Sequence, residues 1–65
     1  MIWQARGKDA TGADTHIANG VSGGWLIVSH KTSGVDLYAL HGNTKTLRSI
    51  GFRSVEAAKE YVERL

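Results

Sequence analysis

The sequence has 65 residues, enough for a single domain with a small core, and eight Lys and Arg against six Asp and Glu give it a formal net charge of +2. It contains no cysteine, which excludes disulfides and thiolate metal sites and fits a cytoplasmic location, and it has no apolar run long enough to span a membrane. The charge excess is small beside the clustered basic residues of a dedicated nucleic-acid binder.

The first 24 residues predict a short strand and a long connection. Residues 1–7 alternate with period two, as a strand does. Residues 8–24 are rich in Gly, Ala, Thr, Asp, Asn and Ser, which favour turns, so this segment is expected to be mostly loop. A brief strand over residues 15–18 is the alternative.

The middle of the chain predicts an antiparallel meander. Its three strand patterns are rich in β-branched, aromatic and aliphatic residues and cover residues 25–30, 35–40 and 45–50. A four-residue turn at 31–34 joins the first two strands, and a tight turn around Gly42 and Asn43 joins the last two.

The last segment predicts an amphipathic helix over residues 55–65. Ser54 has the side chain of a helix N-cap, which accepts a hydrogen bond from an exposed amide of the first turn. Apolar residues recur at helical spacing and form one stripe: Val55, Ala58, Val62 and Leu65. The expected fold is a single α+β domain, residues 1–65. In it an antiparallel sheet of three strands, or four with the N-terminal strand added, packs against one C-terminal α-helix.

The length of the first turn decides which side chains share a face of the sheet. With four residues in that turn, one face carries Leu26, Val28, Leu37 and Ala39, and the other carries Trp25, Ile27, Tyr38 and Leu40. A two-residue turn at Gly42 and Asn43 adds Leu47 to the second face, and a shift of one residue in that turn moves the third strand to the other side. A single short helix covers only one face, and the smaller aliphatic face suits it. The rings of Trp25 and Tyr38 then need another cover: the N-terminal strand, a second copy in a homodimer, or a partner.

The residues expected to contact a partner combine aromatic rings with cations. They are Trp25, Tyr38, Lys31, Lys45 and Arg48. Cations beside aromatic rings also suit phosphates and stacked bases. The alternative for the cations is a solvated sheet edge, at which lysine discourages aggregation.

No catalytic, metal-binding or cofactor-binding site is expected. The histidines, His16, His30 and His41, show no ligand pair at helical or tight-turn spacing. Ser29 and His30 are adjacent on a strand and therefore point to opposite faces, which argues against a hydrolase site that includes Asp36.

The segment 24–61 resembles DNA-binding modules of three strands and one helix, such as the arm-binding domains of integrases. The resemblance rests on Trp25, which opens a strand, and on the helix entry Gly-Phe-x-Ser-x-Glu-Ala-Ala-x-x-Tyr at residues 51–61. It implies a three-stranded sheet whose strands contact DNA. The strands of those modules are laden with arginine, lysine and tryptophan, whereas the strands here are mostly aliphatic, so the DNA-binding residues do not carry over.

Together these features predict a small non-enzymatic protein-binding module that uses an aromatic sheet face, in the manner of an accessory or inhibitor protein of a phage or another mobile element. The alternative is a nucleic-acid-binding module that uses the basic middle of the chain. That stretch, residues 25–54, holds four cations against Asp36 alone: Lys31, Lys45, Arg48 and Arg53. Salt dependence separates the two functions, because binding to nucleic acid weakens steeply as salt rises.

Overall fold

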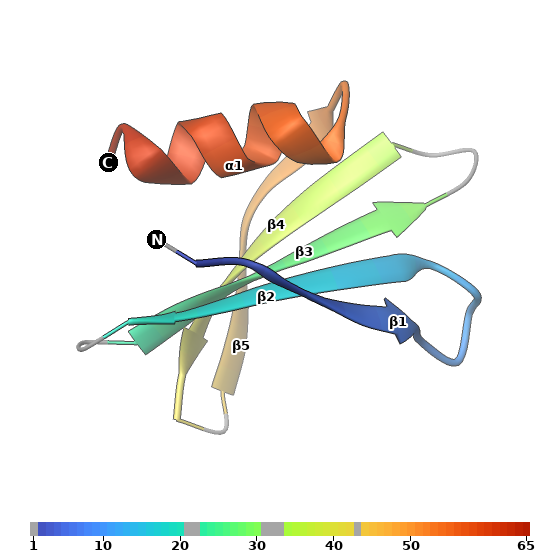
Figure 1. The fold of residues 1–65 in the computed structure, drawn as a ribbon, viewed down its shortest axis with the longest axis horizontal. Helices are drawn as coiled ribbons and strands as arrows, with labels where there is room; N and C mark the ends of the chain where they lie inside the picture. The colour runs from blue at the N-terminus through green and yellow to red at the C-terminus, as the bar shows by residue number, and fades with distance from the viewer. Residues whose placement is uncertain (1, 21–22, 31–33, 43) are drawn as a thin grey trace.

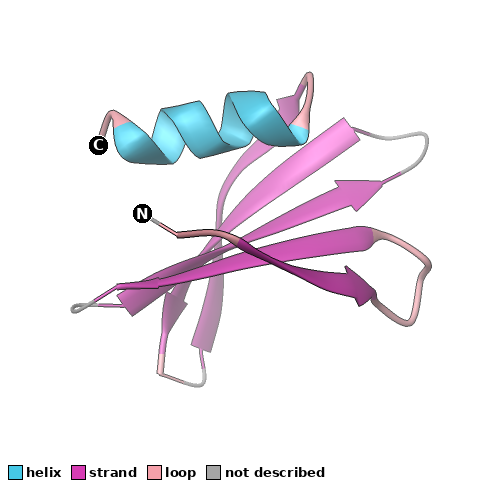
Figure 2. Cartoon of the chain, viewed as in Figure 1, coloured by secondary structure: helices cyan, strands magenta, loops and turns pink. Residues whose placement is uncertain are grey.

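Five strands and one helix make up the part of the chain that the computed structural model describes, residues 2–20, 23–30, 34–42 and 44–65 (Figures 1 and 2). The elements in chain order are β1 (Gln4–Lys8), β2 (Asp14–Gly20), β3 (Gly23–His30), β4 (Gly34–His41), β5 (Thr44–Phe52) and α1 (Val55–Glu63). Each strand is antiparallel to the next, and their order in the sheet is their order in the chain. The expected α+β class is confirmed, with five strands in place of three or four.

The fifth strand is β2, which lies in the segment that was expected to be mostly loop. It is hydrogen-bonded on both sides, to β1 and to β3. The glycines of residues 8–24 and Asn19 therefore lie at the ends of this strand or beyond them. The prediction of mostly loop was wrong, and the alternative of a brief strand over residues 15–18 is confirmed within the longer β2. Two flanking strands supply backbone partners that outweigh a weak local preference for strand.

The connection between β3 and β4 is shorter than the predicted four-residue turn. Gly34 is already the first residue of β4 and has φ +94°, a conformation that favours glycine. The other residues of that predicted turn, 31–33, lie outside the described residues. At the next connection Gly42 has φ +60°, as a primed turn requires, and Asn43 lies outside the described residues.

This shorter connection moves the register of β3 against β4 by one residue. Trp25 lies opposite Ala39, and Ile27 lies opposite Leu37. Because side chains alternate along a strand, the slip places Trp25 and Ile27 on the same face as Leu37 and Ala39. The predicted division of the two faces was therefore wrong for β3.

The helix packs on that face, which we call the inner face. The core cluster joins three strand residues to two helix residues: Ile27, Val35, Leu37, Ala58 and Val62. Trp25 and Phe52 pack against the edge of this cluster. Figure 1 shows α1 on one side of the sheet, with the N-terminal end of the chain beside it.

The helix begins where the sequence predicts. Ser54 Oγ accepts a hydrogen bond from the Ala57 amide at 3.1 Å, which confirms the N-cap. The helix ends at Glu63, two residues before the predicted end, and Leu65 is 63% exposed. The apolar stripe that contacts the sheet is therefore shorter than predicted.

Both edge strands are irregular. In β5, Leu47 lies opposite Tyr38 and Ser49 lies opposite Leu37, so Arg48 is an extra residue in the ladder. A second irregularity follows in β5, and β1 has one at Arg6. Bulges of this kind bend an edge strand and hinder pairing with a strand of another chain.

Candidate functional site

The two faces of the sheet are covered unequally. All five strands belong to one sheet, and α1 packs on its inner face, so no described helix or strand forms a layer over the opposite side. We call that side the outer face. The register places on it Ile17, Leu26, Val28, Asp36, Tyr38, Leu40, Lys45 and Leu47.

An apolar row crosses the outer face. Ile17 lies opposite Leu26, Leu26 opposite Tyr38, and Tyr38 opposite Leu47, so four neighbouring strands each contribute one side chain at the same level. We call these four residues the central row. The first three are half-buried, and Leu47 is 51% exposed. The row is therefore a continuous apolar strip that is partly accessible to solvent and most exposed at Leu47.

A cation lies on one side of the central row. Lys45 is opposite Leu40, one level from Tyr38 along the strands. Its Nζ atom lies 4.6 Å from the centre of the Tyr38 ring, a cation–π distance. The ammonium group is thus held beside the apolar strip at an exposed position.

A carboxylate lies on the other side of the central row. Asp36 is opposite Val28, and its Oδ2 atom is 3.1 Å from His30 Nε2. The Asp36 side chain is 18% exposed and that of His30 is 32% exposed, so this pair is partly shielded from water. The two flanks of the row therefore carry opposite charges.

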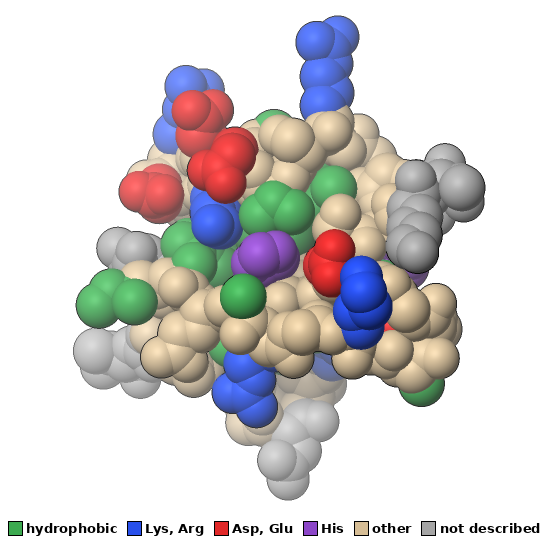
Figure 3. Space-filling model, turned by 45° about the vertical axis from the view of Figure 1, so that its right-hand side comes forward, with side chains coloured by type: hydrophobic (Ala, Val, Ile, Leu, Met, Phe, Trp, Pro, Cys, Tyr) green, Lys and Arg blue, Asp and Glu red, His purple; other side chains and the backbone are tan. Residues whose placement is uncertain are grey.

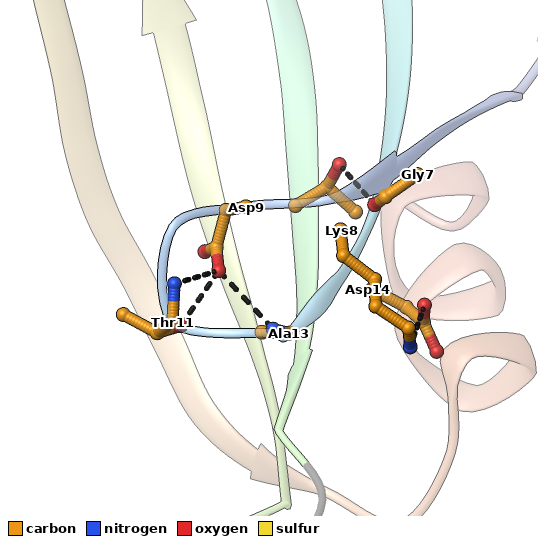
Figure 4. A network of polar contacts seen from close by, with 7 residues as sticks. Gly7, Lys8, Asp9, Thr11, Ala13 and Asp14 are labelled. Atoms are coloured by element: carbon orange, nitrogen blue, oxygen red, sulfur yellow. Dashed lines mark hydrogen bonds and ion pairs between the residues drawn. The ribbon is translucent and has the colours of Figure 1, made fainter.

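In the turn between β1 and β2, one carboxylate accepts three hydrogen bonds in addition to the backbone hydrogen bonds between Asp9 and Ala13 and between Gly12 and Asp9 (Figure 4). Asp9 Oδ1 accepts hydrogen bonds from the Thr11 amide at 2.8 Å, from Thr11 Oγ1 at 2.6 Å and from the Ala13 amide at 3.1 Å. The hydrogen bond from the Thr11 hydroxyl is the main cause that lowers the pKa of Asp9, and the two backbone amides and His30 act in the same direction. Sequence reasoning missed this turn, although the spacing of Asp9 and Thr11 is typical of an Asx-type turn.

The residues predicted to contact a partner fall into two separate pairs. Tyr38 and Lys45 lie together on the outer face. Arg48 Cζ lies 5.7 Å from the centre of the Trp25 ring, and Trp25 packs against the core on the inner face. Lys31 lies outside the described residues. The prediction of one aromatic face that includes both rings was wrong, because the one-residue slip turns Trp25 to the other side.

The N-terminal segment also covers the inner face. Trp3 packs against the core cluster, as Trp25 does. Its Nε1 atom is buried and has no hydrogen-bond partner among the residues that the structure describes. The N-terminal segment thus packs on the same face of the sheet as Trp25, whereas Tyr38 lies on the outer face.

The residues considered for hydrolase or metal chemistry are only partly brought together. His30 and Asp36 are paired on the outer face, but Ser29 lies opposite Val35 on the inner face. Within the described ranges, no three or more histidine, aspartate or glutamate side chains gather as a metal site. The pairing of His30 with Asp36 was not predicted, because the expected register placed them on opposite faces.

On the face that Figure 3 shows, the described basic side chains do not gather in one place. This view, which is turned by 45° from that of Figure 1, shows the blue Lys and Arg side chains at separate positions around the visible surface. Among the described helices there is none that is long and apolar enough to cross a membrane.

Comparisons with family models, with curated proteins and with solved structures found no match for this sequence.

Proposed function

We propose that this protein is a small non-enzymatic module that binds a protein partner through the outer face of its sheet. The observation that carries the proposal is the central row, in which Ile17, Leu26, Tyr38 and Leu47 form an apolar strip over which no described helix or strand lies. Apolar strips of this kind on small soluble proteins usually mark an interaction site, because burial of their surface is favourable. A role as an accessory or inhibitor protein of a mobile element stays a prediction.

The placement of the cations weighs against the alternative of a nucleic-acid-binding module. Lys45 accompanies Tyr38 on the outer face, while Arg48 accompanies Trp25 on the inner face. A nucleic-acid backbone needs several cations on one surface. Among the described cations of the predicted set, Lys45 and Arg48 therefore lie on opposite sides of the edge strand β5 and do not form one basic patch.

Site-specific photo-cross-linking tests the proposal. A benzophenone amino acid placed at Leu47 is expected to form discrete protein conjugates in extracts of the native host, because Leu47 belongs to the central row and is half exposed. The matched control carries the same amino acid at Glu56, an exposed position on α1. We expect excess unlabelled protein to suppress the Leu47 conjugates, and an excess of the Leu47→Asp variant to leave them unchanged.

Two outcomes would contradict the proposal. The first is the same set of conjugates from both positions, since the face would then show no preference. The second is a conjugate at Leu47 that disappears on nuclease treatment and on a moderate rise in salt, which would favour the nucleic-acid alternative.

A further inference from the structure

We infer that the occupant of the outer face is a second copy of this chain, packed antiparallel across a two-fold axis that runs along the central row. The inference rests on the proposed function and names its partner. It is carried by the order of side chains on the face: a cation, an apolar row, and a carboxylate.

A two-fold interface uses the same patch on both copies, so the patch must complement itself. An axis along the central row brings each apolar residue of the row near its own counterpart. The same rotation exchanges the two flanks of the row. The Lys45 flank of one copy therefore faces the Asp36 flank of the other, and the exchange happens twice.

The charges on these flanks suit that arrangement. Lys45 is exposed at the end of its strand, and its long side chain extends from β5 toward β4, where Asp36 lies. His30 contacts one oxygen of Asp36, and an ionised carboxylate accepts more than one donor. A two-fold axis parallel to the strands would instead place the Lys45 flank of one copy opposite the Lys45 flank of the other, where Lys45 meets no carboxylate. The charges therefore favour the axis along the central row, which gives the antiparallel arrangement.

The edges of the sheet offer no comparable route to self-association. Bulges at Arg6 in β1 and at Arg48 in β5 interrupt the regular spacing of backbone donors and acceptors on both edge strands. Face-to-face packing of two aligned sheets avoids these edges and buries the central row.

A charge exchange tests the arrangement. We expect sedimentation equilibrium to show that the wild-type chain dimerises, and that Lys45→Glu weakens the dimer by about tenfold or more, because it places like charges opposite each other at two sites. The double variant with Lys45→Glu and Asp36→Lys is expected to return the dissociation constant to within a few-fold of the wild type. Glu63→Lys on α1, away from the outer face, is the matched control and should change nothing.

A second measurement keeps the test decisive if Asp36→Lys prevents folding. The chain has no cysteine, so Leu47→Cys introduces a single thiol beside the proposed axis. Mild oxidation should link this variant into a dimer much faster than it links Glu60→Cys. Equal rates for the two cysteine variants, or a double charge variant that folds but stays as weak as the single one, would overturn the arrangement.

The failure of this inference differs from the failure of the proposed function. A wild-type chain that stays monomeric up to near-millimolar concentration overturns the second copy as occupant. The proposed function then still predicts a conjugate at Leu47 with a different protein. A monomeric chain that also yields no specific conjugate at Leu47 overturns both.

Discussion

Outside the apolar core of this small domain, single polar residues organise local structure, and Asp9 is the clearest case. Its carboxylate accepts three hydrogen bonds in the β1–β2 turn, and its pKa is lowered in the folded chain. A lowered folded pKa means that the stabilisation is present above the unfolded value of about 3.9 and is lost as pH falls through the folded value. Asp9→Asn keeps one acceptor but removes the charge. Urea unfolding should therefore show a larger stability difference from the wild type at about pH 6 than at about pH 3.

The control for this prediction measures the contribution of the Thr11 hydroxyl apart from that of the backbone amides of the turn. Thr11→Val removes the donor that contributes most to the lowered pKa but keeps the backbone amide bond to Asp9. The pH dependence attributed to Asp9 should become smaller in this variant. An unchanged pH dependence would mean that the Thr11 hydroxyl does not set the ionisation of this carboxylate.

The elements of the fold differ in how well local sequence predicts them. The helix and the meander strands follow from periodicity and capping, signals that lie within each segment. The strand β2 does not, because its pairing with β1 and β3 comes from residues distant in sequence. The register of β3 against β4 turns on whether Gly34 belongs to the turn or to the strand, and composition does not distinguish these.

The N-cap of α1 gives a direct test at this scale. Ser54→Ala removes the acceptor for the Ala57 amide and is expected to lower the free energy of unfolding by about 1 kcal/mol. Ser54→Asp restores an acceptor and adds a negative charge at the positive end of the helix dipole, so it should recover most of that loss. Equal stability of the alanine and aspartate variants in urea unfolding would show that the cap does not stabilise the helix.

At the scale of the whole molecule, one sheet separates a packed side from an accessible side. Sequence reasoning anticipated that one short helix leaves one face without cover, and it named Tyr38 and Lys45, which the structure brings together on that face. It could not assign Trp25 correctly, because a slip of one residue exchanges the faces of an entire strand. The charges that flank the central row do not depend on that slip, because Asp36 shares β4 with Tyr38 and Lys45 is placed by the pairing of β4 with β5.

The asymmetry of the two faces predicts opposite behaviour for two apolar substitutions. Trp25→Ala removes a ring that packs against the core, and it should lower the free energy of unfolding by about 3 kcal/mol, a large part of the stability of a domain this small. Leu47→Ser removes a side chain that is already half exposed, so the loss should stay below about 1 kcal/mol while partner binding falls. Thermal and urea unfolding of the isolated variants measure the first effect, and the Leu47 cross-linking competition measures the second. If Leu47→Ser proves the more destabilising of the two, the central row belongs to the core of the single chain, and the outer face is closed by its own residues.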